Sequence, residues 1–174
     1  REWNFCGLSS TGQYQNAIDL SGDIFTSTNF GEDWSNRYNI GRSDINAISI
    51  THDGQHQTAS NGTSIFVSND YGNTWTKALD TQGTIVYVSI SLNGQYQKVV
   101  ISGDSLYSSN DYGVSWTRLD DDSNLFHSIQ SFPTMSVSIS YNGQYQVIAA
   151  ETIYLSSDYG ATFNDSFTTS FCSS

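Results

Sequence analysis

Two short strings of residues recur along this chain of 174 residues, and their spacing limits its possible folds more than any other feature. The string Gly-Gln-aromatic-Gln, with His56 as the aromatic residue of its second copy, starts at Gly12, Gly54, Gly94 and Gly143. The string Ser-Asn-Asp-Tyr-Gly-Asn-Thr-Trp is complete at 68–75 and has altered copies at 27–34, 109–116 and 156–163. Both strings define four units of about 41 residues, with an insertion between the third and the fourth.

Each unit has the pattern of short antiparallel strands. Apolar and polar residues alternate before the first string, as at Val88, Ile90 and Leu92. Asp-Gly or Asn-Gly dipeptides then favour tight hairpins, because both turn residues adopt positive φ. Four strands in a unit of this length are typical of one β-propeller blade. We therefore predict a single-domain, all-β propeller of four four-stranded antiparallel blades, with units at about 3–41, 44–82, 84–124 and 133–172.

The second string resembles the Asp-box, or BNR repeat, of sialidases, sortilin-type receptors, xyloglucan-degrading glycosidases and photosystem assembly factors. The segment 68–75 matches the family pattern Ser-x-Asp-x-Gly-x-Thr-Trp in full, whereas Asn29 and Asp33 depart from it in the first copy. In that family the box is a structural turn, in which a short carboxylate accepts backbone amides and an aromatic residue anchors the hairpin. The resemblance implies this structural role for Asn29, Gly31, Trp34, Asp70, Gly72, Trp75, Asp111, Gly113, Trp116, Asp158, Gly160 and Phe163.

The chain has two cysteines, Cys6 and Cys172, near its opposite ends. Alignment of the units places both at the junction where a closed ring would join its last blade to its first, so we predict a disulfide that closes the ring. The alternative is a pair of unpaired buried thiols. A disulfide implies an oxidising compartment, and Asn61 and Asn164 lie in glycosylation sequences, so we expect a secreted or extracellular chain.

Charge and hydropathy exclude several classes of partner. Six Lys and Arg stand against seventeen Asp and Glu, a net charge of −11. The basic residues are scattered, so the sequence offers no basic stripe for nucleic acid or for an anionic membrane surface. Wholly apolar runs such as 99–101 are far shorter than the roughly 20 residues of a spanning helix, so we expect no membrane insertion. The absence of a signal peptide favours a mature or an intracellular chain.

The residues do not form the constellation that sialidase chemistry needs, which is three arginines around a carboxylate, a Tyr–Glu nucleophilic pair and an acidic proton donor. Arg37, Arg42 and Arg118 have no equivalents among the repeats, and Arg1 is terminal. Phosphate-loop, dinucleotide-binding and nucleophile-elbow motifs are missing as well. We expect a protein that is not an enzyme and carries no cofactor.

Two weaker patterns remain open. The run Asp120, Asp121 and Asp122 is a weak candidate for calcium, although consecutive aspartates more often form a solvated loop. The repeated aromatic residues of the first string either form platforms for sugars or pack between blades, and we favour packing; they are Tyr14, His56, Tyr96 and Tyr145.

The insertion between the third and fourth units is the irregular part of the scaffold. Departures from a repeat are where such folds often place function. Its segment 124–132 is rich in apolar residues, which predicts an intermolecular contact through Leu125, Phe126, Ile129 and Phe132.

These features favour a non-enzymatic extracellular propeller that assembles with itself or with other extracellular proteins, as a structural subunit of a surface layer, hair or filament. The alternative is a secreted module that binds carbohydrate or protein. A fragment of a glycoside hydrolase is a distant third hypothesis.

Overall fold

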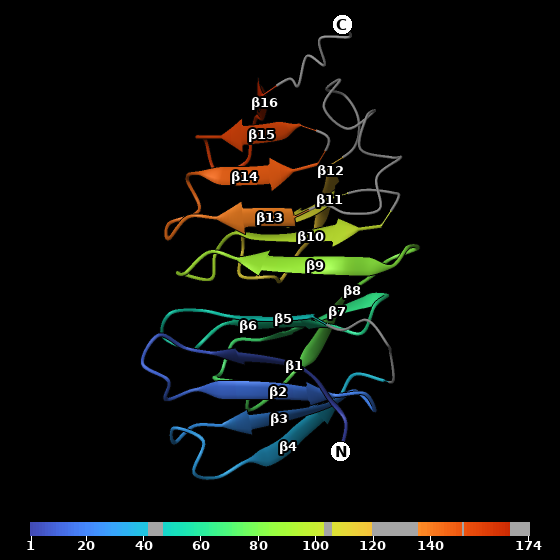
Figure 1. Cartoon of the computed structure of the whole chain (residues 1–174), viewed down its shortest axis with the longest axis vertical. Coiled ribbons are helices and arrows are strands. Elements are labelled where there is room, and N and C mark those ends of the chain that lie inside the picture. Colours follow the sequence, from blue (N-terminus) through green and yellow to red (C-terminus); the bar gives the residue numbers. More distant parts are fainter. Residues whose placement is uncertain (42–46, 103–105, 120–135, 151, 168–174) are drawn as a thin grey trace, which may run out of the picture.

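The chain folds into four antiparallel sheets of four strands each, as predicted (Figure 1). This is a computed structural model that describes residues 1–41, 47–102, 106–119, 136–150 and 152–167. Each sheet is one blade made from contiguous sequence, and its strands pair in chain order. None of the described residues belongs to a helix that is long and apolar enough to cross a membrane.

The sixteen strands are short, and their bounds are as follows. Blade 1 contains β1 (Trp3–Leu8), β2 (Gln15–Asp19), β3 (Asp23–Ser27) and β4 (Ser35–Asn39). Blade 2 contains β5 (Ala47–Ile50), β6 (Gln57–Ser60), β7 (Ser64–Ser68) and β8 (Thr76–Asp80). Blade 3 contains β9 (Ile85–Ile90), β10 (Gln97–Ile101), β11 (Leu106–Ser109) and β12 (Thr117–Leu119). Blade 4 contains β13 (Ser136–Ile139), β14 (Gln146–Ala149), β15 (Ile153–Ser156) and β16 (Asn164–Phe167).

The strand register gives every blade two distinct faces. In blade 2, Ile48 pairs with Ala59 and Ala59 with Phe66, so these three side chains share one face, which points toward blade 1. Thr58 and Val67 alternate with them and point toward blade 3. We call the face toward the preceding blade the head face and the face toward the following blade the tail face. This two-sided burial explains why all residues of β6 and β7 are buried.

The hydrophobic core is divided among the three junctions between consecutive blades. At the first junction the tail face of blade 1, with Ile18 and Ile24, packs on the head face of blade 2, with Phe66 and Trp75. The second and third junctions repeat this arrangement, with Val88 and Val137 as the inner-strand residues of the two head faces. The inner strands β1, β5, β9 and β13 lie next to one another in this order.

The described blades form an open row and do not close into the predicted ring of four blades. Blade 1 and blade 4 lie at opposite ends of the row, separated by blades 2 and 3 (Figure 1). Cys6 lies on the head face of blade 1 as a free, exposed thiol, and Cys172 falls outside the described residues. The physical reason is that each junction turns the next blade by an amount fixed by its packing, and three such turns do not bring blade 4 round to blade 1.

The box aromatics provide a test of this arrangement, since Trp75 is 6% exposed at a junction and Trp34 is 43% exposed on the open head face of blade 1. Trp75→Ala should lower the free energy of unfolding by about 3 to 5 kcal/mol, because it leaves a cavity in the core. Trp34→Ala should lower it by about 1 kcal/mol or less. Urea unfolding of both variants in dilute solution measures the difference, and equal losses would contradict the open row.

Candidate functional site

Each of the four Asp-box turns is held by the same pattern of hydrogen bonds. In the second box the Asp70 carboxylate accepts the Thr74 backbone amide at 2.9 Å and the Thr74 hydroxyl at 2.6 Å. The Ser68 hydroxyl donates to Asp70 and accepts the amide of Gly72. The residue before that glycine, Tyr71, has a φ of 63°, a left-handed conformation that is uncommon for a side chain of this size. The boxes around Asp111 and Asp158 repeat the same bonds.

The first box keeps this turn although its sequence departs from the family pattern. Asn29 stands where the other boxes have aspartate, and its side-chain oxygen accepts the backbone amide of Asp33 at 2.9 Å. The side-chain hydrogen bond is also kept, but its donor and acceptor have changed places: the Asn29 amide donates to the Asp33 carboxylate. The two substitutions therefore compensate each other.

Hydrogen bonds stabilise the charged form of the box aspartates. Burial raises the pKa of Asp70, but the hydrogen bonds from Thr74 and Ser68 outweigh burial and lower that pKa below its ordinary value. The hydrogen bonds from Thr162 lower the pKa of Asp158 to about 2. A carboxylate that already accepts several donors within its own turn is a structural group, and it is poorly placed to act as a general acid or base.

The aromatic residues of the first string stack between blades, each on the box tyrosine of the following blade. The ring centroids of Tyr14 and Tyr71 lie 4.6 Å apart, and those of His56 and Tyr112 are also 4.6 Å apart. Tyr96 and Tyr159 form the third stack at 5.1 Å. These separations are typical of favourable aromatic pairs, so three of the four residues are used in packing.

The glutamines of the first string form a second series of contacts across the junctions. Asn16 of blade 1 donates to the Gln57 side-chain oxygen of blade 2 at 2.6 Å. Thr58 of blade 2 donates to Gln97 of blade 3, also at 2.6 Å. The first two junctions therefore pair a polar tail-face residue on the second strand with the glutamine of the next head face, and both bonds are buried.

Lys98 takes the tail-face position of this series in blade 3. Its ammonium donates to the Ser108 hydroxyl and lies 6.0 Å from the centre of the Phe163 ring. The side chain is buried, and desolvation lowers the pKa of the amine to about 8. The buried side-chain oxygen of Gln146, the glutamine of blade 4, has no hydrogen-bond partner. The polar tail-face position occupied by Asn16 and Thr58 in the first two blades, here called the polar series, thus holds a buried amine at the third junction.

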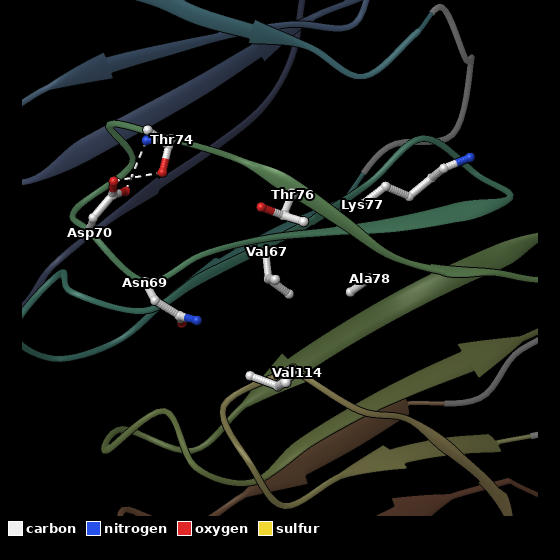
Figure 2. A pocket seen from close by; sticks show the side chains of 9 residues that line it. Val67, Asn69, Asp70, Thr74, Thr76, Lys77, Ala78 and Val114 are labelled. Atoms are coloured by element: carbon white, nitrogen blue, oxygen red, sulfur yellow. Dashed lines mark hydrogen bonds between the residues drawn. The ribbon is translucent and has the colours of Figure 1, made fainter.

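Two equivalent clefts open between the box of one blade and the box of the next. The cleft between blades 2 and 3 has a volume of about 390 Å³, and Figure 2 shows Asn69, Thr74 and Thr76 on one side and Val114 on the other. The cleft between blades 3 and 4 has a volume of about 330 Å³. It is lined at the same repeat positions by Asn110, Ser115, Thr117 and Ala161. Amide and hydroxyl groups recur in both clefts beside apolar side chains and the box carboxylates Asp70 and Asp158, and the first cleft also contains Lys77. The recurring groups can hydrogen-bond to a polar ligand.

The remaining predicted site residues are placed as follows. The half-buried Asn61 uses its side-chain nitrogen, the atom to which a glycan would be attached, to donate to the Ile40 carbonyl. Asn164 is exposed at the start of β16. Within the described ranges no group of three His, Cys, Asp or Glu side chains is placed to hold a metal ion. The calcium candidate Asp120–Asp122 and the contact candidates Leu125, Phe126, Ile129 and Phe132 lie outside those ranges.

Sequence reasoning missed the clefts and the burial of Lys98. One signal was available, because alignment of the first strings places Lys98 with Asn16 and Thr58. The clefts left no such signal, since each combines the outer part of one blade with the box of the next.

No family model and no curated protein matches the chain in sequence. Solved structures match it in fold. The GH74 enzyme of Niastella koreensis superimposes with a TM-score of 0.69 at 15% identity, over 94% of this chain and 24% of that one. YCF48 from Cyanidioschyzon merolae superimposes with a TM-score of 0.57 at 16% identity, over 97% of this chain and 57% of that one. The Cps50 (Swd1) β-propeller domain of Myceliophteria thermophila superimposes with a TM-score of 0.69 at 7% identity, over 88% of this chain and 51% of that one.

These comparisons define the fold class. The chain consists of β-propeller blades, and it spans between about a quarter and somewhat more than half of the length of these structures. At these identities the likeness concerns the fold alone.

Lys98 gives the site a measurable pH dependence. Because the folded state holds this proton less tightly than the unfolded chain, stability should rise as the pH increases from about 8 to the ordinary lysine value of 10.5. Lys98→Met should remove this rise and should raise the free energy of unfolding at pH 7 by on the order of 2 to 3 kcal/mol. Urea unfolding between pH 7 and 10 measures both effects.

The matched control is Lys77→Met, since Lys77 is an exposed lysine paired with Asp80. This variant should follow the wild-type pH profile. A stability difference between Lys98→Met and wild type that stays constant from pH 7 to pH 10 would contradict the assignment.

Proposed function

We propose that this chain is a non-enzymatic assembly subunit, an extracellular propeller element whose two terminal blades bind other chains of a surface layer, hair or filament. The observation that carries the proposal is the exposure of the tail face of blade 4. Ile153 on this face is 40% exposed, whereas its equivalents in the other blades are at most 1% exposed; these are Ile24, Ile65 and Leu106. Val147 and Leu155 extend the same exposed apolar face.

The head face of blade 1 supports the proposal from the other end. Trp3, Phe30 and Trp34 are exposed there, and the Trp3 ring makes an edge-to-face contact with Phe25 at 5.4 Å. Exposed apolar patches on soluble proteins often mark interaction surfaces, and three large aromatic side chains are exposed on this face. The row therefore ends in two surfaces built for packing against further protein.

Self-association tests the proposed function. Light scattering and sedimentation should show that the chain associates at micromolar concentration through apolar contacts, so the association should persist in about 0.5 M salt, where surface charge interactions are screened. A chain that remains a monomer at every concentration would overturn the proposal.

A second candidate function is the binding of a neutral polar ligand, a carbohydrate or an extended peptide, in the clefts between blades. The observation that favours it is the recurrence of the same Asn, Thr or Ser lining at equivalent positions of two clefts. A structure of the neighbour YCF48 contains that protein bound to D1 peptide.

A glycan array followed by calorimetry tests this second function. A ligand of the clefts should bind wild type, and the double variant Asn69→Ala with Asn110→Ala should weaken its binding by about tenfold or more through lost hydrogen bonds. Asn164→Ala, which changes an exposed asparagine outside the clefts, is the control. Retained affinity in the double variant would exclude the clefts.

A further inference from the structure

We propose that the partner of each terminal face is a second copy of this chain, with the tail face of blade 4 on the head face of blade 1, so that two chains complete one ring. This inference rests on the proposed assembly function and specifies its partner and orientation. It follows from the repeat itself, because every junction inside the chain pairs a tail face with a head face.

The aromatic stacks supply the first argument. In all three junctions an aromatic residue of the first string stacks on the box residue of the following blade. The two residues left over are Tyr145 of blade 4, 59% exposed, and Phe30 of blade 1, 64% exposed. Phe30 has a φ of 62°, as the box tyrosines do, so it is presented in the same geometry. Tyr145 and Phe30 are the complementary halves of a fourth stack.

The glycines of the first string supply a second argument. A side chain added at Gly54, Gly94 or Gly143 would collide with the aromatic ring of the preceding blade, with the nearest ring atoms 2.0 to 2.7 Å from the added carbon. The equivalent Gly12 of blade 1 has no neighbouring atom within 4 Å of that position. The space that an aromatic ring of the preceding blade fills at three glycines is therefore open at Gly12, and Tyr145 is the ring that fits it.

One position of the junction differs from the internal ones. The tail-face residues Asn16, Thr58 and Lys98 are polar, whereas blade 4 has Val147 at this place. Gln15 of blade 1 donates to the carbonyl of Gly12, as the other three glutamines donate to the glycine of their own blades, but Val147 offers no donor to its side-chain oxygen. The junction between copies therefore lacks this polar contact and depends on apolar and aromatic packing.

Two copies of four blades give a ring of about eight blades, which lies within the range of known propellers. Head-to-tail contacts between identical chains form a closed ring when the rotation closes, and an open polymer when it does not. A two-chain ring uses the same contact twice and leaves neither terminal face exposed.

Variants of the two faces test the pairing. The tail variant combines Tyr145→Ser with Leu155→Ser, and the head variant combines Phe30→Asn with Trp34→Ala; all four side chains are exposed, so the blades should remain folded, which circular dichroism checks. Tyr87→Ser, which changes an exposed aromatic residue of the internal blade 3, is the control. Sedimentation measures the mass of each variant alone and of the tail and head variants mixed.

Wild type and the control should form a dimer of twice the 19.2 kDa chain mass, and each double variant alone should be a monomer. The mixture should form a dimer again, because its intact head and tail faces are complementary, with an affinity at least about tenfold below that of the doubly joined wild type.

Other results overturn the inference in distinguishable ways. If each double variant still dimerises alone, like faces pair with each other, and the head-to-tail orientation is wrong although the assembly function stands. If wild type grows into polymers, the closed two-chain ring is wrong. If wild type is a monomer, the assembly function fails together with the inference.

Discussion

The packing of one blade face on the next is the interaction on which the rest of the structure depends. No blade has a core of its own: residues such as Ile18, Ile65 and Val100 become buried only because another sheet covers them. Sheets stacked in this way gain the apolar transfer energy that an isolated four-stranded sheet of this size cannot obtain. Burial, aromatic stacking and the buried polar series are therefore properties of junctions, and the terminal blades are unlike the inner ones because each has one junction fewer.

The Asp-box turn supports the packing between blades by holding an aromatic side chain in a fixed position. Its carboxylate and hydroxyl groups satisfy the backbone of a tight turn locally, so the turn keeps its shape whether or not a neighbour is present. The compensating exchange at Asn29 and Asp33 shows that the bonding pattern matters more than the residue types. The rigid turn then holds an aromatic residue in the left-handed conformation, and in blades 2 to 4 this residue is a tyrosine that stacks on the preceding blade.

The blades themselves were predictable from sequence, because turn glycines, alternating strands and repeated boxes are local signals. Cys6 lies on the head face of blade 1, at the position that Ile48, Val88 and Val137 take in the other blades, but the sequence did not show that this face stays exposed. Ring closure depends on the angle between packed sheets, which side-chain volumes such as those of Phe66 and Trp75 set, and no local string encodes that angle. The burial of Lys98 escaped prediction for a related reason: its repeat position is visible in the sequence, whereas its desolvation requires the next blade to be in place.

Within the part of the chain that the structure describes, each blade is formed by one stretch of sequence, and no strand is exchanged between the first blade and the last. A chain built in this way can fold in the order in which it is synthesised, since blade 1 needs no residue beyond Asn39 to pair its strands and blade 2 docks on a surface that already exists. Long-range loop closure, the slow step for many all-β proteins, then does not limit the folding of a single chain. The disadvantage is a risk of aggregation at the most recently folded blade, because its uncovered sheet face stays exposed to other chains until the next blade packs on it.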